Sequence, residues 1–333
     1  MTTPQKVLEG EDGWLYLDHD KNRSVDQYLG KVELTEKTRA AWLSMLSGMS
    51  NLASQLGFQH VQIIAPSKES VYDSWYPHRD RRAAVRPVDA LVAALPDETR
   101  TIFPVQELLQ AGRMRVYDKG DTHWNDYGAY ITVETTLKLL GLADALSIDD
   151  FDFIERRSSG DLDSKMEPRR SEFRITATAR TPRAKRLFDS ELRNRGRTLI
   201  YESPGAPLGS LVLFGDSFAW SLAIFLEQIF RRFVFIHSTS PDQSVIEKEK
   251  PDVVITECTE RFVIEGPARL GKFRIEDVIR LKLARSSTEE RMRIHRLYSE
   301  KAANSSEPFY SNLFLNAATE KSGSDGPTAM PRP

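Results

Sequence analysis

The sequence predicts an α/β fold with a central parallel sheet. Short, continuous apolar runs at 60–66, 211–214 and 253–258 are typical of strands that are buried on both faces. They alternate with amphipathic segments, of which 35–56 has apolar residues at helical spacing. Polar residues follow directly after several of the apolar runs. Because the carboxyl ends of parallel strands share one edge of a sheet, we expect the chemistry of the protein at that edge.

The predicted elements follow the chain in order, beginning with a turn and an edge hairpin. In sequence they are the hairpin 10–17, a helix over 35–56, a strand over 60–66, a helix over 88–95, a strand over 114–117, a helix over 126–140, strands over 197–202 and 211–214, a helix over 218–230, strands over 232–237 and 252–258, and a charged helix over 286–302. The polar stretch 145–190 is an insertion with short β pieces, one of them near 172–178. We therefore predict a main domain over 9–264, a helical extension over 265–320 and a disordered tail, rich in Ser, Gly and Pro, over 321–333.

Composition narrows the function classes. The chain has 333 residues, 40% of them hydrophobic, so a full core is expected. The net charge of −2 gives no case for a nucleic-acid partner. The one cysteine, Cys258, lies in an apolar strand and is expected to be a buried, inert thiol, and no Cys/His cluster predicts a metal site or a bound cofactor. No run of about 18 apolar residues predicts a transmembrane segment, and 1–10 lacks the apolar core of a signal peptide, which favours the cytoplasm.

Ser217 is the predicted nucleophile. The apolar run 211–214 ends at Gly215, which permits a tight turn, and the helix-like segment 218–230 begins directly after Ser217. A serine at such a strand-to-helix turn is lifted out of the sheet, and backbone N–H groups near the helix start can stabilise an oxyanion. The alternative is that Asp216 and Ser217 are ordinary helix caps.

Asp121 and His123 supply the other parts of a catalytic triad. They follow the strand-like run 114–117, and residues two apart in an extended segment point the same way. Asp121 is therefore expected to orient the imidazole of His123, which acts as the general base for Ser217. His237, at the end of the strand 232–237, is the alternative base.

Four further residues are weaker candidates for substrate binding. Lys68 and Tyr72 lie in the loop that leaves the strand 60–66. Trp124 directly follows His123, and Arg261 follows the last strand, 252–258. The alternative interpretations are a solvated lysine in a loop and aromatic side chains that belong to the core.

Six segments form an ordered pattern along the chain. They are GEDGWLY at 10–16, PSKESVY at 66–72, DTHW at 121–124, SGDL at 159–162, GDSF at 215–218 and PDVVITE at 251–257, the last followed by Glu260 and Arg261. Together they resemble the SGNH-hydrolase-like domain of the alginate O-acetyltransferase AlgJ/AlgX family, over roughly 9–264. The order of the Asp/His and Ser blocks is permuted relative to ordinary SGNH enzymes, as it is in this family.

The resemblance implies an α/β/α sandwich, and it implies that Ser217 is the nucleophile, His123 the general acid/base and Asp121 its orienter. It also implies the periplasm, a polysaccharide acceptor such as alginate, and a membrane-bound O-acyltransferase that supplies acetyl groups. Because the compartment implied by the family disagrees with the missing signal peptide, localisation stays open. A carbohydrate-binding module after residue 265 is not expected, and the Gly and Asn oxyanion blocks of ordinary SGNH enzymes cannot be placed.

The sequence thus favours a polysaccharide O-acetyltransferase that works through an acetyl-serine. An acetyl esterase uses the same chemistry until water replaces the sugar hydroxyl, so the sequence does not separate the two. A non-catalytic protein that binds glycans or assists their assembly is the third alternative, because a fold can persist without its activity.

Overall fold

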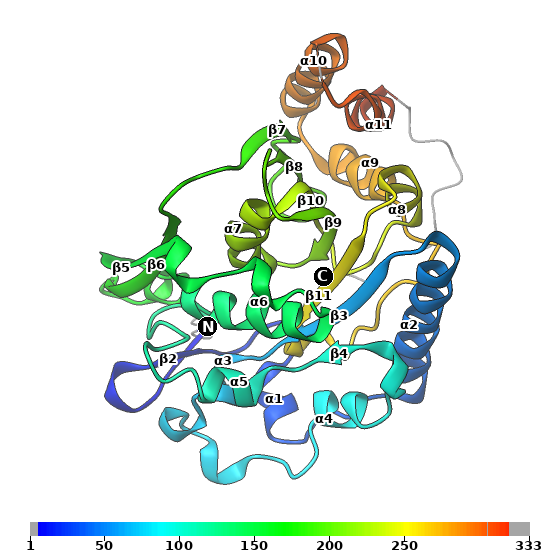
Figure 1. The fold of residues 1–333 in the computed structure, drawn as a ribbon. Coiled ribbons are helices and arrows are strands. Elements are labelled where there is room, and N and C mark those ends of the chain that lie inside the picture. Colours follow the sequence, from blue (N-terminus) through cyan, green and yellow to red (C-terminus); the bar gives the residue numbers. More distant parts are fainter. Residues whose placement is uncertain (1–5, 305, 320–333) are drawn as a thin grey trace.

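The computed structural model describes residues 6–304 and 306–319, and a seven-stranded sheet with helices on both faces dominates it (Figure 1). The strand order is β4-β3-β11-β9-β10-β8-β7. The five strands from β4 to β10 run parallel to their neighbours, and β8 and β7 extend the sheet in antiparallel orientation. The strands are β3 (Gln59–Ala65), β4 (Thr101–Ile102), β7 (Lys185–Asp189), β8 (Thr198–Glu202), β9 (Leu208–Gly215), β10 (Phe230–His237) and β11 (Val253–Thr259). The predicted α/β fold with a mostly parallel central sheet is confirmed.

Alternate residues of the central strands face two separate hydrophobic cores. On β9, Leu211 and Leu213 join one core, whereas Val212 and Phe214 join the other. All four are at most 1% exposed, as expected for a strand that is covered on both faces. Cys258 on β11 is buried in the second core.

Helices cover both faces of the sheet. α6 (Asp126–Leu140) and α7 (Ala219–Ile229) pack on the first core, together with the short helices α3 (Lys68–Val71) and α5 (Val105–Leu109). The second core is closed by α2 (Glu36–Leu56), α4 (Pro87–Val92), α8 (Gln243–Glu249), α9 (Ile275–Arg285), α10 (Thr288–Asn304) and α11 (Pro308–Thr319). α1 (Ser24–Tyr28) lies near the start of the chain. The long helix α2 begins where the Thr35 hydroxyl accepts the N–H of Thr38, and it ends at Gly57, whose φ of 80° suits a residue without a side chain.

Two small hairpins lie outside the main sheet. β1 (Val7–Glu9) pairs with β2 (Leu15–Leu17), and β5 (Phe151–Ser158) pairs with β6 (Glu172–Ala179). The hairpin β5–β6 lies within the predicted insertion, and it projects at the left of Figure 1 beside α6. Its buried residues Phe151, Ile175 and Ala177 join the first core, so the hairpin is packed against the domain.

The predicted strand over 114–117 is wrong. This segment forms only an isolated bridge between Tyr117 and Trp124 and is otherwise a loop. Asp121 and His123 therefore lie in a bend before α6 and not at the end of a sheet strand. The short apolar run was misleading because Val116 and Tyr117 are buried in the first core without pairing with the sheet.

The residues after 265 share a core with the sheet. Ile279 of α9, Tyr298 of α10 and Phe314 of α11 are fully buried in the second core. The division into a main domain over 9–264 and a helical extension over 265–320 stays a prediction, and the predicted tail 321–333 lies outside the described residues. Within the described parts of the chain, no helix has the length and apolar character needed to cross a bilayer.

Candidate active site

Ser217 lies in a tight turn between β9 and α7, at the carboxyl end of a central parallel strand. The turn requires a glycine before it. A Cβ on Gly215 would lie 2.5 Å from the Cβ of Ala219 and 2.7 Å from Oε2 of Glu257. Because neither neighbour is free to move away, any larger residue at this position would displace the turn.

Asp216 holds the turn in place and does not cap the helix. Its Oδ1 accepts the N–H of Phe218 at 2.9 Å, and its Oδ2 accepts the N–H and the hydroxyl of Thr259 at 2.8 and 2.7 Å. Its own N–H donates to Oε2 of Glu257 at 2.9 Å. Burial, together with the nearby Asp216 charge, raises the pKa of Glu257 well above its usual value. The turn is thus fixed to the neighbouring strand β11 by a buried network.

The structure brings Asp121, His123 and Ser217 into one hydrogen-bonded chain. Oδ1 of Asp121 lies 2.8 Å from Nδ1 of His123, and Nε2 of His123 lies 2.8 Å from Oγ of Ser217. The same Oδ1 also accepts the backbone N–H of His123 at 2.9 Å, which bends the loop so that carboxylate and ring face each other. With its Nδ1 proton directed at the carboxylate, the imidazole presents the lone pair of Nε2 to the serine hydroxyl.

The carboxylate of Asp121 is buried and strongly paired. Its side chain is 7% exposed, and its Oδ2 lies 2.9 Å from Nη2 of Arg174 and 3.3 Å from the N–H of Asp161. Burial raises the pKa of Asp121, but the hydrogen bond and charge of His123 and the charge of Arg174 outweigh it and hold the pKa well below its usual range. Asp121 therefore stays ionised at any pH at which the protein would work.

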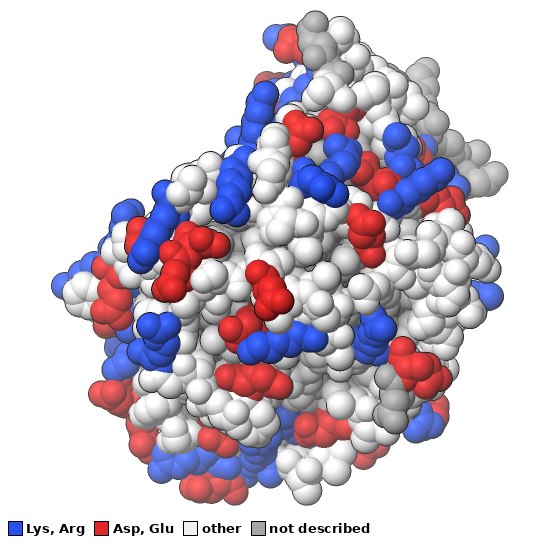
Figure 2. Space-filling view, viewed as in Figure 1, with Lys and Arg blue, Asp and Glu red and all other residues white. Residues whose placement is uncertain are grey.

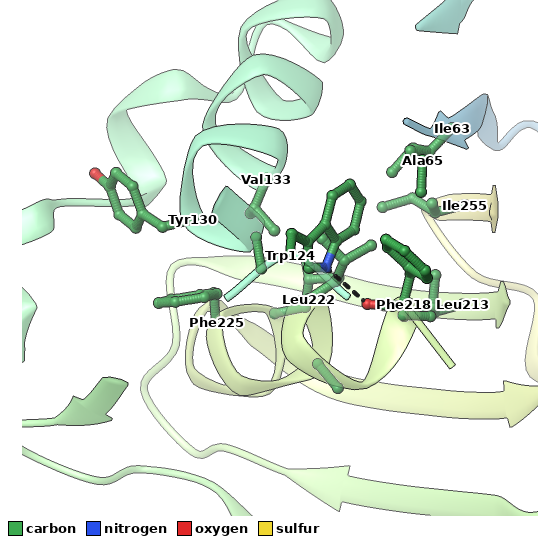
Figure 3. Close-up of a cluster of buried hydrophobic side chains, with 14 of the residues drawn as sticks. Ile63, Ala65, Trp124, Tyr130, Val133, Leu213, Phe218, Leu222, Phe225 and Ile255 are labelled. Atoms are coloured by element: carbon green, nitrogen blue, oxygen red, sulfur yellow. Dashed lines mark hydrogen bonds between the residues drawn. The ribbon is translucent and has the colours of Figure 1, made fainter. Parts of the chain in front are cut away.

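Trp124 supports the serine turn from the side of α6. Its indole N–H donates to the carbonyl of Phe218 at 3.0 Å, and the two rings meet edge-on with centroids 5.2 Å apart. Figure 3 shows this contact among Leu213, Leu222 and Ile255 of the first core. The Phe218 ring also lies 4.9 Å from the ring of His123. Trp124 is 1% exposed, so it supports the segments that carry His123 and Ser217 from within the core.

Lys68 and Tyr72, predicted as contacts for the substrate, are part of the scaffold. The Lys68 ammonium is buried and donates to the carbonyls of Leu15, Asp118 and Lys119 at 2.8–2.9 Å. Burial lowers the pKa of Lys68 to about 8, which still leaves it protonated at pH 7. The Tyr72 hydroxyl accepts the N–H of Val116 at 2.9 Å. Both side chains thus hold the loop that leads to Asp121 and His123.

Replacing Lys68 with methionine is expected to lower the free energy of unfolding by about 2–4 kcal/mol, because three buried carbonyls lose a charged donor. Urea unfolding of the full chain measures this loss. The matched control is Lys138→Met on α6, where an exposed ammonium pairs with Glu134, and its expected change is within about 0.5 kcal/mol. Equal effects of the two substitutions would contradict a structural role for Lys68.

Arg261, the fourth of the weaker candidates, also lies beside the serine turn. Its guanidinium stacks 5.6 Å from the ring centroid of Phe218 and 4.9 Å from that of Phe262, and it is partly exposed. A cleft of about 640 Å³ opens beside Ser217. Its polar and charged lining includes Arg193, Arg195, His237, Glu265 and Lys282.

His237, the alternative base, lines this cleft. Its Nδ1 accepts the indole N–H of Trp220 at 3.2 Å, and burial lowers the pKa of His237 to about 4. The imidazole is therefore neutral at pH 7. No hydrogen bond joins it to Ser217 among the described residues, whereas His123 makes one.

Two residues of this site were not predicted from the sequence. Arg174 comes from β6, and Asp161, whose carboxylate accepts the N–H and hydroxyl of Thr122 at 2.6 and 2.9 Å, comes from the loop between β5 and β6. Asp161 belongs to the segment SGDL at 159–162, which carried part of the family resemblance without a role. No local pattern marks Arg174, because it is one of many arginines in this insertion.

Asp121, His123 and Asp161 also bring three potential metal-ligand atoms within 4.8 Å of one another. Each is engaged by the protein: the Asp121 carboxylate by His123 and Arg174, and the Asp161 carboxylate by Thr122 and Lys165. We interpret the group as a hydrogen-bonded network with balanced charge. On the face shown in Figure 2, basic and acidic side chains are likewise interspersed over the described surface.

Comparisons with known proteins identify the family by a family model and support the fold by solved structures. Residues 7–245 match the family model described as the SGNH hydrolase-like domain of the acetyltransferase AlgX. No curated protein sequence matches. Bacillus cereus PatB1 with a sulfonyl adduct is similar in structure, with a TM-score of 0.56, 16% identity and coverage of 77% of this chain and 97% of that one. A DHHW family protein from Eubacterium siraeum is similar with a TM-score of 0.56 and 11% identity, and the match covers 80% of this chain and 99% of that one. The O-acetyltransferase domain of Pseudomonas putida AlgJ is similar with a TM-score of 0.50 and 18% identity, and the match covers 84% of this chain and 99% of that one.

Proposed function

Because this chain belongs to the family of the SGNH hydrolase-like domain of the acetyltransferase AlgX, we propose that it transfers acetyl groups to hydroxyls of a polysaccharide. The observation that carries the proposal is the unbroken chain of 2.8 Å contacts from Asp121 through His123 to Ser217. The similar AlgJ structure from Pseudomonas putida is an O-acetyltransferase domain, which agrees with this assignment.

The first half-reaction forms an acetyl-serine. Nε2 of His123 takes the hydroxyl proton of Ser217 while Oγ attacks the carbonyl carbon of the acetyl donor. The tetrahedral intermediate collapses, the bond to the leaving oxygen breaks, and the imidazolium returns its proton to that oxygen. Asp121 stabilises the imidazolium throughout and keeps its proton on Nδ1.

Backbone geometry favours one oxyanion donor near the nucleophile. The N–H groups of Asp216 and Phe218 are already bonded to Glu257 and to the side chain of Asp216. The N–H of Ser217 has no acceptor among the described residues, and we assign it to the oxyanion.

The second half-reaction regenerates Ser217. His123 removes a proton from a sugar hydroxyl, the sugar oxygen attacks the acetyl-serine, and the proton returns to Oγ as the ester bond breaks. The cleft beside Ser217 supports a hydroxyl-rich acceptor, because its lining offers both donors and acceptors of hydrogen bonds. Supply of the acetyl group by a membrane-bound O-acyltransferase stays a prediction from the family.

Hydrolysis is the second candidate function. The His123 side chain is 27% exposed, so water reaches the base that would activate it. An acetyl esterase would use the same three residues and differ only in the acceptor.

The test follows the acetyl group through both steps. The full chain is incubated with p-nitrophenyl acetate, alone and with neutral or uronic-acid oligosaccharides, and intact mass, acetate and acetylated sugar are measured. We expect one acetyl group on the peptide that contains Ser217 and transfer to an oligosaccharide in preference to water. Release of acetate alone would favour the esterase. An adduct elsewhere would contradict the mechanism, and oligosaccharide binding without any adduct would favour a non-catalytic protein.

A further inference from the structure

We propose that Arg174, on the hairpin β5–β6, is a positioning residue that holds the outer oxygen of Asp121 and so sets the pH at which His123 can act as a base. This inference rests on the proposed function, because it concerns how Arg174 affects the three residues to which that function assigns the chemistry. It gives the insertion between α6 and β7 a role in the chemistry.

The two oxygens of Asp121 have divided tasks. Oδ1 accepts both the ring Nδ1–H and the backbone N–H of His123. Oδ2 faces away from the ring and lies 2.9 Å from Nη2 of Arg174, with the N–H of Asp161 at a longer 3.3 Å. Without Arg174, Oδ2 would keep one long neutral hydrogen bond, while Oδ1 would keep both of its bonds to His123 and the full carboxylate charge would stay beside the ring.

The guanidinium of Arg174 is directed at the carboxylate of Asp121. Its Nε is buried, lies 3.7 Å from Oδ2 of Asp118, and makes no hydrogen bond within the described parts of the chain. The contact of Arg174 with Asp121, through Nη2, is thus the shorter of its two carboxylate contacts. The guanidinium is 32% exposed, so it lies between the buried carboxylate and solvent.

The hairpin is anchored without the Arg174 side chain. The N–H of Ile175 donates to Oδ1 of Asp118 at 3.3 Å, and the N–H of Ala177 donates to Oδ2 of Asp126 at 2.8 Å. Ile175 and Ala177 are buried in the first core. A substitution of Arg174 therefore changes the partner of Asp121 while the strand stays in place.

The charge of Arg174 opposes protonation of the imidazole. A carboxylate beside a histidine stabilises its charged form, and a cation on the far oxygen offsets part of that effect. The other charged groups around the pair are Lys68 from α3, Asp118 and Asp161 from two loops, Lys165 beside Asp161, and Arg261 beyond the Phe218 ring. Removing Arg174 leaves these in place and takes away the cation in direct contact with Asp121. The imidazole is then expected to protonate at a higher pH.

The experiment compares Arg174→Met with wild type and with Arg174→Lys, using the pH dependence of kcat/KM for p-nitrophenyl acetate. We expect the acidic limb of the Met variant to move to higher pH by roughly half to one unit, a shift limited by the exposure of the guanidinium. Arg174→Lys keeps the positive charge, so we expect its acidic limb to lie close to that of wild type. The matched control is Arg156→Met, since Arg156 lies directly opposite Arg174 on the hairpin but is exposed, and its limb is expected to stay in place.

A second readout does not require turnover. The ring of His123 is titrated by NMR in wild type and variants, with its signal assigned by its loss in His123→Gln. A raised titration midpoint in Arg174→Met supports the proposal even if the ester is not a substrate, so failure of the proposed function and failure of this inference are told apart. A lower rate at every pH with an unmoved midpoint would overturn it. If the Met variant melts early, Arg174→Gln, which keeps a donor for Oδ2 and removes the charge, tests the same shift.

Discussion

Ser217→Ala is expected to lower kcat for p-nitrophenyl acetate by roughly 10⁶-fold and to abolish the acetyl adduct. In the proposed mechanism this hydroxyl attacks the donor, and His123 is its hydrogen-bond partner. We expect a residual acceleration of about 10³–10⁴ over water from the oxyanion donor and binding. Initial rates and intact mass measure the two effects.

The fold is expected to tolerate this substitution. The turn is held by Asp216 and Trp124 and not by the serine hydroxyl, so the melting temperature should change by no more than about 2 °C. The matched control is Ser221→Ala in α7, whose hydroxyl interacts with Asp126 and lies outside the catalytic chain. Its rate should stay within about two-fold of wild type. Near-normal turnover by Ser217→Ala would remove this serine from the mechanism.

Asp121→Asn is expected to lower kcat by roughly 10⁴-fold, the second largest effect. An amide at this position would turn its NH₂ group toward either the ring or Arg174, and it would no longer fix the proton on Nδ1 of His123. The imidazolium would also lose the buried charge that stabilises it. Single-turnover acetylation of Ser217 measures the loss in the step that needs the base.

Asp161→Asn is the control for this carboxylate. Asp161 lies in the same cluster, but its oxygens bond Thr122 and Lys165 and not the imidazole, so we expect a loss of less than about ten-fold. Equal losses in the two variants, together with rescue by an added divalent cation, would contradict the triad and favour a metal site in this cluster.

The parts of the site that could be predicted are those encoded by local sequence. The run 211–214, Gly215 and the helix after Ser217 specify a strand, a turn and a helix within ten residues, and the structure has all three. The pairing of Asp121 with His123 was expected from an extended strand, but it arises from a bend closed by a side-chain hydrogen bond. The two residues meet in either case because they are only two apart.

The parts that could not be predicted depend on where the chain returns in space. Lys68 was expected at the edge of the sheet, and the direction of its side chain toward three carbonyls is set by the hairpin β1–β2 and the loop before α6, which arrive from different parts of the chain. Arg174 reaches Asp121 only because β6 packs beside α6. Sequence spacing carries no information on either approach.

The hydrogen bond between Trp124 and the carbonyl of Phe218 joins two segments that are distant along the chain. Contacts of such long sequence separation form only after a large loop has closed, so they are entropically costly to make early in folding. Ser217 and His123 are therefore brought within reach of each other only when α6 and α7 have docked on the same face of the sheet. A partly folded chain with an intact sheet would still be inert, and acetylation of Ser217 would report the completion of tertiary assembly.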